Sequence, residues 1–398
     1  MKLFQKLLLT PAVIGFLSPI NVNASEASLK DVSNYSQVDV EVTQDTFKPL
    51  SNKNPLLAGG EGLGQSQSSD IDGDTFSSTT TAAFSSNWVM GSVDKDNTAK
   101  ATSFVYDYVV ELTSSFTGND ALVVELENGN NDGVFSDLDI KNGSIALSGI
   151  SYTRELGDRL TVFVGGHGVK GSSLYQSACV YGGQTDVLDD CGIRSSNLDE
   201  GLGASFGASF DFGYGITAAV GYEGQGDTTK GIATKEATDA IGAQIAYTGD
   251  NYGLALAVAS IENHDTDTPT SNDIDDDRGL TTSTALSAYF TPDLDNFPSV
   301  SVGIESTHDD SAAANGDTTS NYFVGLQWDE LGQGVLGASF GSKAPELENG
   351  DAEKMYEVFY SYNYADGITI TPLVFVKENA AANVNDETGI FLKTSFNF

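Results

Sequence analysis

Apolar and polar residues alternate along most of this chain with a period of two. That period is typical of a β-strand whose two faces meet different surroundings. Phe104, Tyr106 and Tyr108 fall on one face of such a segment, while Asp107 and Glu111 fall on the other. The pattern therefore predicts an all-β protein built from many short strands.

Sixteen segments with this pattern follow one another from about Thr75 to Phe398. They begin near Phe76, Ala101, Ala121, Ser144, Leu160, Gly203, Ile216, Thr238, Leu254, Ser283, Ser299, Ser320, Gly334, Glu353, Ile368 and Thr388. Two are irregular: the strand from Ser144 changes phase near Gly149, and the strand from Ile368 has apolar residues on both faces. Two-residue alternation over so many strands favours a barrel.

The connections between these segments alternate strictly between short and long. Turns such as 117–120 and 365–367 separate longer connections such as 128–142 and 168–201. Bacterial outer-membrane barrels have this asymmetry, with short periplasmic turns and longer external loops. The sequence therefore predicts a transmembrane antiparallel barrel of sixteen strands over 75–398, with both ends on the periplasmic side. A β-sandwich is the alternative, although it gives no reason for alternating loop lengths.

The first 74 residues lack the alternating pattern. Residues 1–24 combine two lysines, a short apolar run and small residues at Ala24, which is typical of a secretory signal peptide. Residues 25–74 are interpreted as a periplasmic leader. They include Asp70-Ile-Asp72-Gly-Asp74, which resembles the start of a calcium loop. The glycine expected at the sixth position and the closing glutamate at the twelfth are both missing, so the segment is interpreted as a solvated turn.

Charge and composition exclude several classes of protein. The net charge of −37 repels nucleic acid and offers no phosphate-binding patch. The chain has three histidines, and none lies beside either cysteine in the sequence, so no metal site or cofactor is expected. The even cysteine count in an exported chain indicates a disulfide between Cys179 and Cys191.

Parity with the outward aromatic and aliphatic residues assigns a set of charges to the lumen. These are Asp107, Glu111, Glu125, Asp211, Glu305, Glu353, Glu357 and, as the clearest opposing charge, Lys393. Acidic rings attract cations, so a cation preference is predicted. Lys170 and Arg194 in the third long connection could reverse the sign locally. The alternative is that these charges form only a solvated surface.

Two G-x-S-x-G matches, at Ser205 and Ser339, resemble the nucleophile motif of hydrolases. That motif needs a sharp turn between a strand and a helix. Both matches lie inside alternating strands, so no catalytic residue is predicted. An outer-membrane hydrolase remains a distant alternative.

The chain stops at Phe398, at the end of an alternating strand. A terminal aromatic on the last strand is common in outer-membrane barrels, where the barrel-assembly machinery reads it. Phe398 is therefore predicted to be an assembly signal.

Two stretches resemble the major outer-membrane porins of marine unicellular cyanobacteria, which belong with the carbohydrate-selective porin family. They are MKLFQKLLLTPAVIGFLSPINVNA at the start and FVYDYVVELTSSFTGND at 104–120. The resemblance implies a barrel of sixteen strands in the cell outer membrane. Relatives usually carry an S-layer-homology domain and a coiled-coil stalk before the barrel, and residues 25–74 are too short for both.

Resemblance to general porins also implies that the third external loop, 168–201, folds into the barrel and narrows it. The expected function is a water-filled porin for passive diffusion of small polar solutes, such as sugars and inorganic ions including iron. The alternative is a structural or adhesive barrel with a closed lumen. Outer-membrane lipid and the assembly machinery are the expected partners, and the sequence leaves a homotrimer open.

Overall fold

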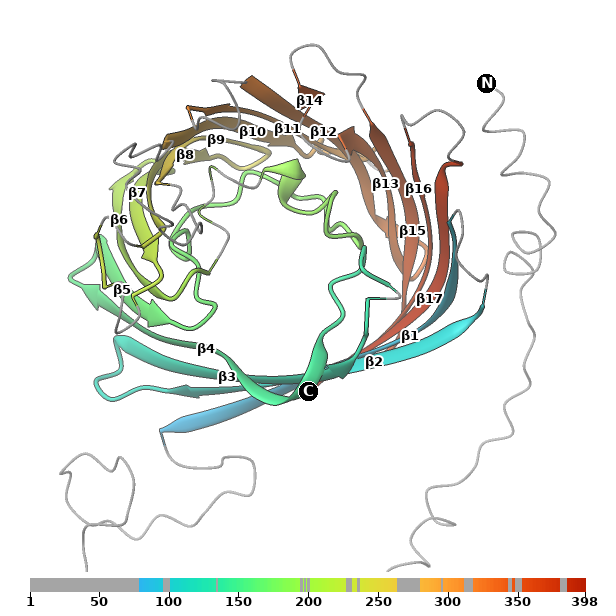
Figure 1. Ribbon diagram of the computed structural model, residues 1–398, viewed down its shortest axis with the longest axis horizontal. Coiled ribbons are helices and arrows are strands. Elements are labelled where there is room, and N and C mark those ends of the chain that lie inside the picture. Colours follow the sequence, from blue (N-terminus) through green and yellow to red (C-terminus); the bar gives the residue numbers. More distant parts are fainter. Residues whose placement is uncertain are drawn as a thin grey trace, which may run out of the picture. The chain divides into compact units, whose positions relative to one another are not determined.

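The strands of this chain form one closed antiparallel barrel in the computed structural model (Figure 1). The structure describes residues 79–398 apart from 96–100, 134, 194–195, 197, 199–200, 227–230, 235–236, 263–279, 295, 311–317, 343–345, 348–352 and 380–384. The expected signal peptide, the leader with its Asp70–Asp74 turn, and Arg194 lie outside the described residues. Among the described residues, no helix is long and apolar enough to cross a membrane.

Seventeen strands and one short 3₁₀-helix are formed by the described residues. They are β1 Thr80–Asp94, β2 Ser103–Ser114, β3 Asp120–Asn130, β4 Asn142–Leu156, β5 Leu160–Gly166, η2 Asp190–Gly192, β6 Ala204–Gly213, β7 Ile216–Gly224, β8 Asp239–Thr248, β9 Tyr252–Glu262, β10 Leu280–Phe290, β11 Ser299–Asp309, β12 Thr318–Leu331, β13 Gly334–Ser342, β14 Glu346–Leu347, β15 Lys354–Ala365, β16 Ile368–Lys377 and β17 Glu387–Asn397.

Sixteen of these strands make the barrel wall. Each pairs with its neighbours in sequence, β13 pairs directly with β15, and β1 pairs with β17 to close the ring. The two-residue β14 pairs only with β12, outside the wall order. The prediction of a sixteen-stranded antiparallel barrel is therefore confirmed, and each predicted strand start lies within four residues of the observed one.

The closing seam joins the first and last strands over ten residue pairs, from Ser85 opposite Asn397 to Asp94 opposite Thr388. Phe398 extends it, because its backbone exchanges two hydrogen bonds with Phe84, at 2.7 and 3.0 Å. The two rings also pack, with centroids 4.8 Å apart. The described chain thus enters and leaves the barrel at the end that carries the short turns.

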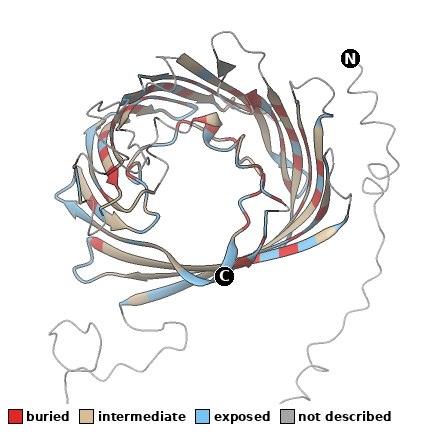
Figure 2. Cartoon of the chain, viewed as in Figure 1, coloured by how far each residue is buried: buried red, intermediate tan, exposed pale blue. Residues whose placement is uncertain are grey.

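Burial alternates along the strands because one face of the wall points outward and the other inward (Figure 2). On β9, Leu254, Leu256 and Val258 are exposed on the outer face, whereas Ala255 and Ala257 are buried on the inner face. Apolar residues therefore lie on the outer face of the wall.

Both irregular strands have a local cause. In β4 the register shifts so that Gly149 lies opposite Glu125 and Leu147 opposite Leu126, which leaves Ser148 as an extra residue in a β-bulge. The phase change predicted near Gly149 is this bulge. In β16 the inward residues Leu373 and Phe375 are apolar because a loop covers them.

Candidate functional site: the loops inside the barrel

The connection between β5 and β6, residues 167–203, folds into the barrel and follows its inner wall (Figure 1). Its backbone N–H groups donate to inward side chains of five strands. The bonds are Gly171 N to Glu223 Oε2 at 2.9 Å, Gln176 N to Gln244 Oε1 at 2.7 Å, Val180 N to Ser301 Oγ at 3.0 Å, Gly182 N to Gln327 Oε1 at 2.9 Å and Gln184 N to Glu357 Oε1 at 3.1 Å. These acceptors come from β7, β8, β11, β12 and β15, so they fix the loop along half of the barrel.

The loop returns along the same wall. Gly201 N donates to Glu223 Oε2 at 3.3 Å, so Glu223 holds both legs of the loop near its base. Burial of this carboxylate is complete, at 0% exposure. A buried carboxylate needs donors in place of water. Both loop amides supply them.

Inward glycines make room for the loop backbone. A Cβ on Gly221 would lie 2.1 Å from Gly171 O, and one on Gly303 would lie 2.1 Å from Cys191 O. Real Cβ atoms do not approach other atoms so closely. The wall beside β7 and β11 therefore admits the loop only because these positions have no side chain.

We expect the substitution Gly303→Ala to lower the free energy of unfolding by about 1–3 kcal/mol, because the new methyl group overpacks the Cys191 carbonyl. Gly149→Ala is the matched control. Its Cβ would meet nothing nearer than Val169 Cγ2 at 3.4 Å. Urea unfolding of both variants tests this, and equal stability would contradict the packing of the loop on β11.

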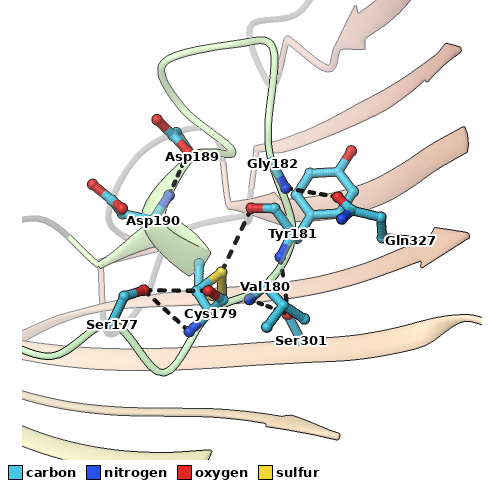
Figure 3. The surroundings of a disulfide bond; sticks show 10 residues. Ser177, Cys179, Val180, Tyr181, Gly182, Asp189, Asp190, Ser301 and Gln327 are labelled. Carbon is cyan, nitrogen blue, oxygen red and sulfur yellow. Dashed lines mark hydrogen bonds between the residues drawn. A yellow bond between two sulfur atoms is a disulfide. The ribbon is translucent and has the colours of Figure 1, made fainter. Parts of the chain in front are cut away.

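A disulfide between Cys179 and Cys191 joins the two legs of the loop beside β11 (Figure 3). The Cα atoms lie 5.9 Å apart, and 12 positions of sequence separate the cysteines. Ser301 and Gln327 hold the outgoing leg at the same place, through Val180 and Gly182. Residues 180–190, here called the tip, project beyond the bridge.

Replacing both cysteines, in the variant Cys179→Ser/Cys191→Ser, is expected to cost about 3 kcal/mol of stability, since closing a loop of this length restricts the unfolded chain. Equilibrium unfolding with and without reductant measures the effect. Thiol reagents should leave the unreduced wild-type protein unmodified. Modification of both cysteines without reductant would rule out the bridge.

A second loop, residues 131–141 between β3 and β4, also folds inward. Phe135, Leu138 and Ile140 are buried in one cluster with Phe375 and Phe391 of β16 and β17. The rings of Phe135 and Phe391 meet edge to face with centroids 4.8 Å apart. This loop thus covers the apolar inner face of the strands around the seam.

Polar contacts complete the seating of the second loop. Asp107 of β2 accepts a hydrogen bond from Lys141 N at 3.1 Å and another from Asn87 N at 2.9 Å. Lys377 of β16 forms an ion pair with Asp137. Asp186 N of the tip donates to Asp137 O at 3.0 Å, so the two loops contact each other.

The charges that the sequence assigned to the lumen do not share one environment. Asp107, Glu305 and Glu357 face inward but are 1–2% exposed. The first and the last of these hold the two loops, so they do not line open water. Glu111, Glu125 and Glu353 are half-buried, and Asp211 is exposed close to the β6–β7 turn. Glu125 accepts from Ser148 Oγ at 2.5 Å, beside the bulge.

A lumen cavity of about 470 Å³ lies between the tip, the second loop and the wall at β1 and β17. Its charged lining comes mainly from the loops. The negative residues are Asp139, Asp186, Asp189 and Asp190, and the positive residues are Lys170 and Lys393. Lys393 Nζ donates to Gln184 Oε1 of the tip at 3.4 Å. Sequence reasoning selected Lys393 and noted Lys170, but it missed the four aspartates because loops have no periodicity to mark a facing direction.

The surroundings of Asp189 in this cavity shift its pKa. The surrounding protein partly desolvates it, and the neighbouring charge of Asp190 adds repulsion, which together raise the pKa of Asp189 to about 6. Its Oδ1 accepts from Asp190 N at 2.9 Å, which favours the charged form but does not offset these effects.

Lowering the pH from 7.5 to 5 should protonate Asp189 and remove one negative charge from the cavity. Any preference for cations over anions in the passage of ions through the lumen should therefore weaken with a midpoint near pH 6, and Asp189→Asn should abolish that step. Because folding raises this pKa above its ordinary value, the stability contribution of Asp189 is present at low pH and is lost as the pH rises through about 6. Reversal potentials at a series of pH values check the prediction, and an unchanged step in Asp189→Asn would contradict it.

The serines of the two G-x-S-x-G matches lie inside strands. Ser205 and Ser339 lie within β6 and β13, with buried side chains, and neither occupies a turn into a helix. No group of three His, Cys, Asp or Glu side chains among the described residues could hold a metal ion.

Solved structures that resemble this barrel are bacterial porins. An anion-selective porin from Comamonas acidovorans matches with a TM-score of 0.58 and 13% identity, covering 80% of this chain and 99% of that chain. OprB of Pseudomonas putida, in a high-pH structure, matches with a TM-score of 0.58 and 10% identity over 80% and 94% of the two chains. A mutant of the porin from Rh. blastica matches with a TM-score of 0.52 and 13% identity over 80% and 100%.

No family model and no curated protein sequence matches the chain. Identities of 10–13% establish a shared fold and leave solute and selectivity to the residues of this chain. Nearly the whole length of each porin aligns with it. The chain therefore has the fold of the bacterial outer-membrane porins, a closed barrel of sixteen antiparallel strands.

Proposed function

We propose that this protein is an outer-membrane porin, a water-filled channel through which small hydrophilic solutes diffuse passively, with a preference for cations. The observation that carries the proposal is the lumen cavity of about 470 Å³, lined by four aspartates and two lysines. Charges that line a narrow aqueous passage with low-dielectric walls concentrate ions of the opposite sign. The excess of carboxylates favours cations.

The lining of the lumen cavity also bears on the solute. Its described residues are polar or charged apart from Ile193 and Gly183, and none is aromatic. Such a surface suits hydrated inorganic ions, iron included, and small polar molecules. Sugars can pass through the same channel, but the cavity itself offers them no aromatic face.

A closed structural or adhesive barrel is the competing function. Sixteen strands leave room for an aqueous channel, whereas eight do not. Both inward loops fill part of that room, and the lumen cavity remains beside them. One structural neighbour is described as an anion-selective porin. Because the two chains are only 13% identical, the selectivity of that porin says nothing about the lining of this one.

The surroundings of the barrel are part of the proposal. Exposed apolar residues on the outer face suit outer-membrane lipid. Phe398 at the seam is proposed as the signal for the assembly machinery, and a homotrimer is proposed because trimers are common among porins.

Conductance across a planar bilayer tests the function directly. The wild-type protein should form open channels, and a salt gradient should give a reversal potential on the cation-selective side. Asp186→Asn/Asp190→Asn should lower the cation-to-anion permeability ratio several-fold, since one unit charge at 4 Å in water attracts a cation by about 1 kcal/mol.

Asp211→Asn is the matched control, because it neutralises an exposed acid near the β6–β7 turn, outside the lumen cavity. Its permeability ratio should stay close to that of the wild type. Absence of conductance would contradict the proposed channel function. A reversal potential on the anion-selective side would contradict only the proposed preference for cations.

A further inference from the structure

An ion pair outside the lumen cavity links the barrel wall to both inward loops. Lys377, near the end of β16, contacts Asp137 of the second loop, and the two side chains are only 13% and 8% exposed. Neither residue lines the lumen cavity. Both charges lie largely out of bulk water, and Glu387 of β17 lies opposite Lys377 in the strand register.

Asp137 has a second contact through its backbone. Its carbonyl accepts the hydrogen bond from Asp186 N of the tip at 3.0 Å. Asp186 belongs to the carboxylate set of the cavity together with Asp189 and Asp190. The chain of contacts therefore runs from the wall at Lys377, through Asp137, to the charged tip.

The other contacts of the second loop with the wall are an apolar cluster and a backbone hydrogen bond. Phe135, Leu138 and Ile140 pack into the cluster, which is non-directional, and Lys141 N donates to Asp107 Oδ2 at 3.1 Å at the end of the loop. Lys377 and Asp137 supply a directional contact at the part of the loop that meets the tip.

We propose that Lys377 and Asp137 are a positioning pair, which fixes the second loop on the wall and thereby sets the place of the tip carboxylates in the channel. The proposal rests on the proposed function, because its electrical readout needs an open channel. It assigns control of selectivity to two residues that no permeating ion would touch.

Two neutralising variants separate positioning from simple charge effects. If the pair acts only by its charges, Lys377→Met leaves the lumen more negative and raises the cation preference, whereas Asp137→Asn lowers it. If the pair positions the tip, both variants release the carboxylates. The reversal potential then moves toward zero in both, and the single-channel conductance rises.

Arg159→Gln is the matched control, since it removes an exposed positive charge in the short turn between β4 and β5. It should behave as the wild type. Shifts of opposite sign in Lys377→Met and Asp137→Asn would overturn the proposal. So would conductance and reversal potentials equal to those of the wild type.

Hydrogen exchange over residues 183–190 gives a readout that needs no current. Exchange should be faster in both neutralising variants and should return toward the wild-type rate in the charge swap Asp137→Lys/Lys377→Asp. If the single variants do not fold, the folded swap decides: wild-type exchange supports the pair, and fast exchange overturns it. A wild-type protein without conductance would contradict the proposed function. Hydrogen exchange would still test whether Lys377 and Asp137 position the tip.

Discussion

Every backbone N–H of a loop placed inside a barrel needs an acceptor, and this requirement governs the interior of the protein. An N–H left without a partner away from water costs about 1–3 kcal/mol. Here the wall supplies side-chain acceptors at five successive places along the β5–β6 loop. Glu223 and Glu357, the two buried carboxylates among them, hold its base and its tip. The course of the loop therefore follows from the inward residues of the strands.

The same requirement divides the inner wall into two kinds of surface. Where the loop lies against β7 to β13, small inward residues such as Gly221, Ala255, Ala257, Ser283 and Gly303 stand between the larger side chains that accept its hydrogen bonds. Around the seam the inward residues are large and apolar, and the second loop covers them. The open part of the lumen is thus lined largely by loop residues, and its charge is set by residues in loops more than by residues in strands.

Sequence reasoning reached the barrel because the alternation of apolar and polar residues is a local property of each strand. It also detected the bulge at Ser148 as a change of phase near Gly149, and the covered face of β16 as a strand apolar on both sides. The inward course of the β5–β6 loop was expected only from resemblance to general porins. The contacts that fix the inward loops join residues far apart in the sequence, such as Asp137 with Lys377, and leave no local pattern. Asp186, Asp189 and Asp190 carry no signal in the sequence that distinguishes them from the other acids of the chain.

Net charge is consequently a weak guide to the charge of the lumen. The chain carries 56 acidic residues, yet Glu223, Glu305 and Glu357 are buried in the wall. A buried carboxylate that accepts backbone hydrogen bonds acts as a structural acceptor, whereas an exposed one on a loop acts as a charge in water. The two roles differ because backbone N–H groups replace water around the buried carboxylate, whereas the exposed carboxylate stays hydrated. Selectivity is therefore to be sought among the few charges of the lumen cavity, which the wall acids hold in place.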